Sequence, residues 1–248
     1  MIKEVIFDID NTLYSYDKGH GEGLKALCSY AREQLGVDSE EFLEMVKRTN
    51  QEITDRLGKD NASIHSRSIR FQNLLEKWEK PLFPHVQAMY HVYWDTLLKV
   101  SGPEPGAIAC MEELKSMGIR IGIGTDMTAM MQYEKLSAFG FAPYISHIVT
   151  SQEAGVEKPH PVFMELCIKK AEARPEECVF VGDNFKKDAQ GASACGMHGV
   201  WYNPKGKELP GEIKQSAGKY KEIRHFDELA PYVRTLQHRS HINQRNEA

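Results

Sequence analysis

The sequence predicts an α/β fold in which a helical bundle interrupts a doubly wound parallel sheet. From about residue 102 onward, short apolar stretches alternate with segments of helical periodicity, which is the pattern of a parallel sheet covered by helices on both faces. A further apolar stretch, residues 2–9, supplies another strand near the N-terminus. Residues 19–100, which lie between these two parts, show helical periodicity almost throughout. The helical segment is therefore predicted to be an insertion into the sheet.

Each predicted strand is a short apolar run that ends at polar or glycine residues. The expected strands span residues 5–8, 119–123, 145–150, 178–181 and 199–202. Helices are expected between them, over residues 107–117, 128–139, 159–173 and 187–195. Ligands of such sheets bind beyond the carboxyl ends of the strands, so polar residues at those ends are candidates for a functional site.

The inserted segment is predicted to form four helices. Apolar spacing places them at residues 24–35, 38–53, 63–78 and 85–100. Asp38 and Glu41 have the spacing of a capping box at the start of the second helix. We therefore expect a core domain of residues 1–15 and 100–237, a helical cap domain of residues 16–99, and a flexible polar tail of residues 238–248.

The composition is that of an ordinary globular protein. The chain has 248 residues, of which 41% are hydrophobic and 27% charged, with a net charge of -4. This slight acidity argues against a nucleic acid polymer as partner, and the absence of a run of eighteen apolar residues argues against a membrane span. The N-terminus lacks the pattern of a signal peptide, and the five cysteines lack metal spacing, so we expect a cytoplasmic protein with reduced thiols. Whether it is a monomer or a homodimer stays open.

The most informative residues are Asp8 and Asp10, directly after the first apolar run. Ionised carboxylates are rarely buried unless they are paired or bind a metal. An Asp-x-Asp pair alone is equally compatible with a plain turn, so its meaning depends on partners elsewhere in the chain.

Three further strand or helix boundaries supply those partners. Thr125 and Asp126 end the apolar run at 119–123, and Lys158 precedes two prolines that open a helix. Gly182 and Asp183 end the run at 178–181; Asn184 and Asp188 follow. A hydroxyl, a lysine and a second acid pair at element boundaries form an order that is hard to obtain by chance, and they favour a metal-assisted active site over a plain turn.

These motifs resemble the haloacid dehalogenase-like (HAD) phosphohydrolase superfamily. The resemblance covers about residues 1–15 and 100–235, and it implies a Rossmann-like core, an inserted cap, and Mg2+ as cofactor. The four motifs correspond to Asp8-x-Asp10-x-Thr12, Thr125, Lys158-Pro159, and Gly182-Asp183 with Asp188.

The resemblance also implies a role for each motif residue. Asp8 is the nucleophile that forms an aspartyl-phosphate, and Asp10 is the general acid and then the general base. The Mg2+ ligands are the side chains of Asp8 and Asp183 and the backbone carbonyl of Asp10. Thr125 and Lys158 bind the phosphoryl oxygens.

The remaining positions are expected to have supporting roles. By the same resemblance, Asp188 orients a metal-bound water or Lys158. Asp126 follows Thr125, where its backbone amide could contact phosphate, while its side chain is expected to cap the next helix. Thr12 is expected to stabilise the loop after Asp10 rather than to contact the substrate, and Asn184 either hydrogen-bonds near the metal or shapes a turn.

The expected reaction is hydrolysis of a small phosphate monoester, with a nucleoside monophosphate or a sugar phosphate as candidate substrates. The haloacid dehalogenases proper lack the second acid, so Asp10 argues against dehalogenation. A phosphotransferase or phosphomutase of the beta-phosphoglucomutase type is the alternative, and a non-catalytic binding protein is a weaker one. In the cap, Arg67 or Arg70 could reach a second anionic group, whereas the aromatic pair Tyr90 and Trp94 is expected to serve packing.

Overall fold

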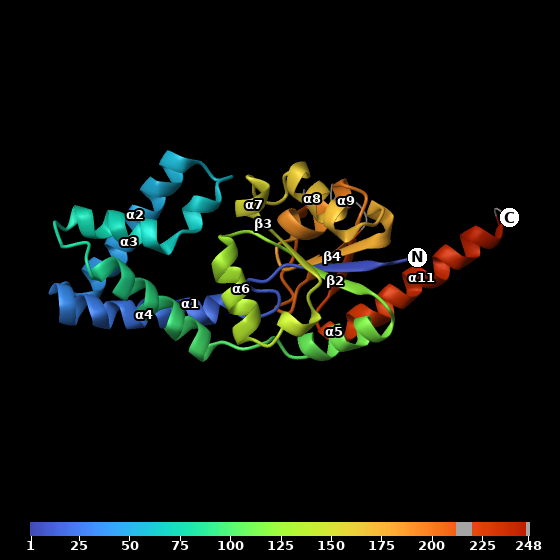
Figure 1. Ribbon diagram of the computed structural model, residues 1–248, viewed down its shortest axis with the longest axis horizontal. Helices are drawn as coiled ribbons and strands as arrows, with labels where there is room; N and C mark the ends of the chain where they lie inside the picture. Colours follow the sequence, from blue (N-terminus) through green and yellow to red (C-terminus); the bar gives the residue numbers. More distant parts are fainter. Residues whose placement is uncertain (212–219, 247–248) are drawn as a thin grey trace.

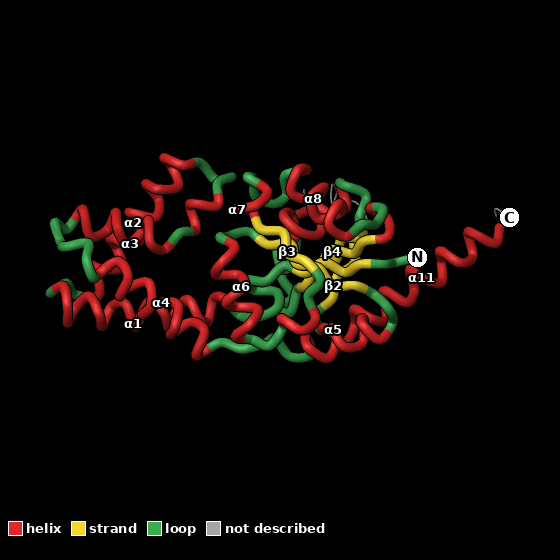
Figure 2. Tube along the Cα trace, in the orientation of Figure 1, coloured by secondary structure: helices red, strands yellow, loops and turns green. Residues whose placement is uncertain are grey.

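The computed structural model describes residues 1–211 and 220–246, with side chains up to residue 238. Its centre is a sheet of six parallel strands in the order β3-β2-β1-β4-β5-β6, seen edge-on between two layers of helices in Figures 1 and 2. The strands are β1 (Glu4–Phe7), β2 (Arg120–Thr125), β3 (His147–Thr150), β4 (Cys178–Gly182), β5 (His198–Tyr202) and β6 (Tyr220–Ile223). The α/β fold and the parallel sheet are confirmed; strand β6 was not expected from the sequence.

The strand order reverses next to β1, which places three strand ends side by side. Phe7 of β1 lies opposite Ile123 of β2 and Val181 of β4. The chain continues from β1 outward through β2 and β3, then crosses back to β4 on the other side of β1. This is the switch point at which open parallel sheets bind their ligands.

Helices cover both faces of the sheet, as Figure 1 shows. Val5 and Phe7 point into a core that includes Leu229 of the C-terminal helix, whereas Ile6 points into a second core with Phe163 and Met164. Strands buried on both faces explain the continuous apolar runs in the sequence. The helices of this part are α5 (Ala107–Ser116), α6 (Ala129–Ala138), α7 (Ser151–Ala154), α8 (Pro161–Ala171), α9 (Gly191–Ala194) and α11 (Leu229–Asn246).

Between β1 and α5 the chain forms the helical cap, the blue-to-green half of Figure 1. Its helices are α1 (Tyr16–Tyr30), α2 (Ser39–Leu57), α3 (Arg67–Lys77) and α4 (His85–Val100). Helix α1 continues into a π-helical turn over Ala31–Leu35. The four helices of the sequence prediction are thus present, and Asp38 caps α2 by accepting from the amides of Glu40 and Glu41 at 2.8 and 3.1 Å.

One expected helix takes another form: the segment 187–195 is a π-helical turn, Phe185–Gln190, followed by the short α9. Helix α11 continues to Asn246 and so includes most of the segment 238–248, which the sequence predicts to be a flexible tail; residues 247–248 lie outside the described residues. All five cysteines are free thiols. Within residues 1–211 and 220–246, no helix is both long and apolar enough to cross a bilayer.

Candidate active site

Asp8 lies directly after β1 and is 6% exposed. Its amide donates to the carbonyl of Val181 at 2.9 Å, which fixes it to the end of β4. Thr12 Oγ1 donates to Asp8 Oδ2 at 3.2 Å and accepts from the amide of Asp183 at 3.0 Å. Thr12 therefore connects two motif loops from inside the protein, as the loop-stabilising interpretation predicts.

Lys158 reaches the same point from the loop before α8. Its Nζ lies 2.6 Å from Asp8 Oδ1 and 2.8 Å from Asp188 Oδ1. Burial disfavours the Lys158 ammonium, but the charges of Asp188 and Asp8 outweigh that cost and raise its pKa. Burial, together with the neighbouring carboxylates of Asp188 and Asp183, raises the pKa of Asp8 above its ordinary value although Lys158 opposes this.

Three carboxylates crowd together at this end of the sheet. Oxygen atoms of Asp8, Asp183 and Asp188 lie within 4.8 Å of one another. Burial and the charge of Asp188 raise the pKa of Asp183 to about 6. The single charge of Lys158 therefore does not neutralise the three carboxylates of the cluster. Such a set of hard oxygen donors fits Mg2+. Both oxygens of Asp188 already accept hydrogen bonds, one from Lys158 and the other from the amide of Asn184 at 2.9 Å, as do both oxygens of Asp8, from Lys158 and Thr12.

Glycine at position 182 allows this crowding. A Cβ on Gly182 would overlap the carboxylate of Asp188. Asn184 opens the π-helical turn that carries Asp188, since its Oδ1 accepts from the amide of Lys187 at 3.1 Å. The turn role expected for Asn184 is therefore observed, and the residue also lines the cavity above Asp8.

Asp126 does not cap the next helix, which corrects the sequence prediction. Its Oδ1 accepts from the amide of Lys158 at 3.0 Å, and its Oδ2 accepts from Lys187 Nζ at 2.8 Å. Burial alone would raise the pKa of Asp126, but the charges of Lys158 and Lys187 lower it. These two cations hold the side chain at the active site, and the first amide of α6, that of Ala129, is bonded by Gln152 instead.

Asp10 is held by three side chains that the sequence reasoning missed. Lys135 Nζ lies 2.6 Å from its Oδ1, the Tyr14 hydroxyl donates to the same oxygen at 2.5 Å, and Gln132 Nε2 donates to Oδ2 at 3.0 Å. Burial would raise the pKa of Asp10, but Lys135 and these hydrogen bonds together lower it. Gln132 also donates to Thr125 Oγ1 at 2.8 Å.

A sequence signal for Gln132 and Lys135 existed. They lie three residues apart on the face of α6 that also carries Met131 and Leu136, and all four side chains are buried. A polar pair on the apolar face of a helix next to a motif residue indicates a buried partner.

A cavity of about 290 Å³ lies above these residues, between the sheet and the cap. The core side is formed by the motif residues, and the cap side by Tyr16, His65, Arg67 and Arg70. His65 Nε2 lies 2.5 Å from Glu157 Oε1, which ties the cap to the loop before Lys158. The cavity therefore has room for a small ligand whose anionic end would lie near Lys158.

The family model for haloacid dehalogenase-like hydrolases matches residues 2–196. The chain belongs to this family. As a HAD-like hydrolase it is similar to the ribulose-1,5-bisphosphate 5-phosphatase of Halopiger xanaduensis, with 34% identity over 82% of this chain and 86% of that protein. It is also 34% identical to the glyceraldehyde 3-phosphate phosphatase of Methanopyrus kandleri, over 79% of this chain and 82% of the relative.

Solved structures of HAD-like proteins share the fold. A HAD phosphatase from Thermococcus onnurineus superposes with a TM-score of 0.70 at 24% identity, covering 94% of this chain and 98% of that one. A 2-haloacid dehalogenase from Pseudomonas syringae gives 0.76 at 22% identity, covering 95% and 99%. At these identities the likeness concerns architecture, including the cap, and not the reaction.

Proposed function

We propose that this HAD-like hydrolase is a Mg2+-dependent phosphatase that acts on a small phosphorylated metabolite through an aspartyl-phosphate on Asp8. The observation that carries the proposal is the environment of Asp8, a buried carboxylate 2.6 Å from the Lys158 ammonium and close to two further carboxylates. Two phosphatases, each 34% identical to the chain, support the same class of reaction.

The first step forms a bond between Asp8 Oδ and phosphorus and breaks the ester P–O bond. Asp10 gives its proton to the leaving oxygen. Lys158 and the Thr125 hydroxyl bind the equatorial oxygens, where negative charge develops. Bound Mg2+, held by Asp8, Asp183 and the carbonyl of Asp10, would supply the positive charge that lets a phosphate approach the carboxylates.

The second step breaks the bond between Asp8 and phosphorus. A water attacks phosphorus, Asp10 accepts the proton of that water, and inorganic phosphate leaves with Asp8 restored as a carboxylate. The contact with Lys135 keeps Asp10 ionised, which suits this base role. For the acid role we propose that Asp10 first takes up a proton from solvent and gives it to the leaving oxygen, and that the proton accepted from the attacking water then restores its acid form.

The cap, which we assign to residues 16–99, would exclude water and select the substrate over the core of residues 1–15 and 100–237. A small sugar phosphate is favoured, because the two relatives are a ribulose-1,5-bisphosphate 5-phosphatase and a glyceraldehyde 3-phosphate phosphatase. Arg67 and Arg70, both in the cavity, suit a polar substrate better than a purine or pyrimidine base.

The test is phosphate release from a panel of sugar phosphates, nucleoside monophosphates and small acid phosphates, with Mg2+ and with EDTA. We expect metal-dependent release that is strongest for sugar phosphates. Transfer of phosphate to a second sugar without release would replace the hydrolase with a mutase. Equal release in EDTA would exclude the proposed metal role.

A further inference from the structure

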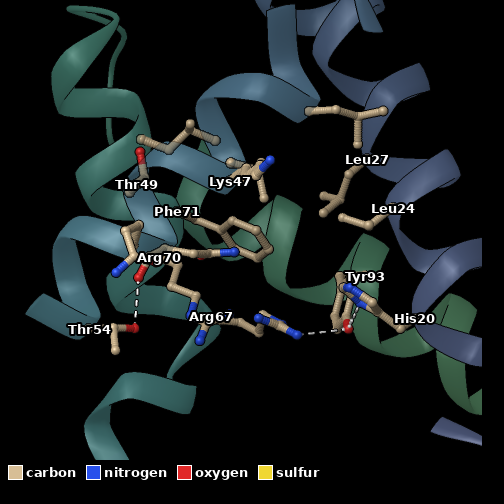
Figure 3. A pocket seen from close by; sticks show the side chains of 15 residues that line it. His20, Leu24, Leu27, Lys47, Thr49, Thr54, Arg67, Arg70, Phe71 and Tyr93 are labelled. Carbon is tan, nitrogen blue, oxygen red and sulfur yellow. Dashed lines mark hydrogen bonds between the residues drawn. The ribbon is translucent and has the colours of Figure 1, made fainter. Parts of the chain in front are cut away.

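Two arginines of α3 stand between two cavities. Arg67 and Arg70 line the cavity above Asp8 and also a cavity of about 390 Å³ inside the cap. Figure 3 shows the cap cavity, with Arg67 joined to the hydroxyl of Tyr93 and His20 joined to the same hydroxyl. The arginines therefore form the cap's polar boundary opposite the phosphoryl site.

The lysines of the active site are each matched by carboxylates, whereas these arginines are not. Lys158 pairs with Asp8, and Lys135 pairs with Asp10, each at 2.6 Å. Lys187 likewise has two carboxylate partners, Asp126 and Glu157. Among the side chains that the structure describes, no carboxylate lies within 4.0 Å of a guanidinium nitrogen of Arg67 or Arg70.

Arg67 is anchored by neutral groups only. Its Nη2 donates to the hydroxyls of Tyr16 and Tyr93 at 2.5 and 3.0 Å, and its guanidinium lies 4.7 Å from the centre of the Tyr93 ring. Its Nε is buried and has no hydrogen-bond acceptor. These contacts orient the guanidinium but leave its positive charge without a counter-charge.

Arg70 adds a second uncompensated charge nearby. Its Nε and Nη2 both donate to the carbonyl of Ile64, at 2.8 and 2.5 Å. Burial and the charge of Arg67 lower the pKa of Arg70 to about 10, and burial with both arginines lowers the pKa of His20 to about 4. The cap side of the cavity is thus positively charged at neutral pH, with the missing counter-charge left to a ligand.

We propose that Arg67 and Arg70 bind a second anionic group of the substrate, a phosphate or a carboxylate, while its scissile phosphate lies at Asp8. The inference rests on the proposed phosphatase function. The substrate class is then a short-chain phosphate monoester with an anion at its other end. Guanidinium groups suit this role, because they bind both phosphate and carboxylate through paired N–H donors.

The test compares esters that differ only in the second anion, such as 3-phosphoglycerate with glycerol 3-phosphate, and ribulose 1,5-bisphosphate with ribulose 5-phosphate. The wild type should prefer the doubly anionic member of at least one pair in kcat/KM, and the pair that shows the preference distinguishes carboxylate from phosphate. The variant Arg70→Gln should raise KM for that ester by roughly 10- to 100-fold, the range for a hydrogen-bonded charge, with kcat little changed. Its KM for the singly anionic partner should stay within about threefold, and Arg70→Lys should recover part of the loss.

Arg48→Gln is the matched control, because Arg48 is exposed on α2 and lies outside both cavities. Arg67→Gln, checked by thermal unfolding because Arg67 packs on Tyr93, should repeat the Arg70→Gln result. Equilibrium binding of the same esters to an Asp8→Asn protein gives a readout that does not require turnover. It therefore distinguishes a failure of the phosphatase proposal from a failure of the proposed anion binding by the two arginines. Equal binding and turnover of both members of every pair, or a preference that survives in Arg67→Gln and Arg70→Gln, would overturn the inference.

Discussion

Replacing Lys135 by methionine should destabilise the protein through Asp10. Lys135 is completely buried, its Nζ lies 2.6 Å from Asp10 Oδ1, and the Asp10 side chain is 25% exposed. Removing one partner of a buried ion pair costs about 3–5 kcal/mol. We expect the lower end, about 3 kcal/mol, because Asp10 keeps its bonds to Tyr14 and Gln132 and is partly solvated. For a chain of this size, that corresponds to a fall in Tm of about 6–12 °C.

The loss of stability in Lys135→Met should depend on pH through the ionisation of Asp10. Because the pKa of Asp10 is lowered in the folded protein, the stabilisation is present above its ordinary value of 3.8 and is lost as the pH falls through the folded value. Urea unfolding should therefore show a large difference between wild type and Lys135→Met at pH 7, and a smaller one below about pH 4.

A double-mutant cycle with Asp10→Asn isolates the pair. Asp10→Asn leaves the Lys135 ammonium without its counter-charge, whereas the double variant leaves neither charge unpaired. The double variant should then lose less stability than the sum of the single variants. Additive losses, or a Lys135→Met protein within about 0.5 kcal/mol of wild type, would refute the reasoning.

Three other perturbations have defined outcomes. Glu4 is fully buried, and burial raises its pKa to about 7 from 4.5. The folded protein therefore binds a proton that the unfolded chain has lost, and stability falls as the pH rises from 4.5 to about 7. Glu4→Gln should flatten this slope in urea unfolding, and an unchanged slope would contradict the assignment to Glu4. His65→Ala removes the 2.5 Å contact with Glu157. In steady-state assays KM should rise about fivefold, which corresponds to a hydrogen bond of about 1 kcal/mol. An unchanged KM would show that this contact does not hold the cap closed. A Cβ at Gly199 would overlap a backbone carbonyl oxygen, whereas a Cβ at Gly21 would meet open space. Gly199→Ala should therefore lower Tm and Gly21→Ala should not. Equal Tm values for the two variants would contradict the close packing at Gly199.

The positions of the motif residues could be predicted from the sequence, for a geometric reason. Asp8, Thr125 and Asp183 each end or follow a short apolar run, and parallel strands bring their carboxyl ends to the same edge. The structure has these three residues at the carboxyl ends of the neighbouring strands β1, β2 and β4. Strand β6 was missed because its sequence, Tyr-Lys-Glu-Ile, has only one fully buried residue, Ile223.

The environment of Asp10 could not be predicted in the same way. Lys135 and Gln132 lie more than 120 residues from it, and only the tertiary placement of α6 brings them into contact with it. The interpretation of Asp126 as a helix cap failed for the same reason, since Lys187 reaches it from a π-helical turn whose geometry local sequence does not specify. The aromatic pair of Tyr90 and Trp94 does serve packing, with Trp94 2% exposed.

If Asp8 is the nucleophile, a phosphoenzyme can be trapped on it. Wild type and Asp8→Asn, shown by thermal unfolding to be equally folded, are mixed with Mg2+ and the best ester of the panel and quenched in acid. We expect covalent phosphate on the peptide that contains Asp8 in the wild type, and neither this adduct nor phosphate release in the variant. Full phosphate release by Asp8→Asn, or covalent phosphate on another residue, would contradict this role of Asp8.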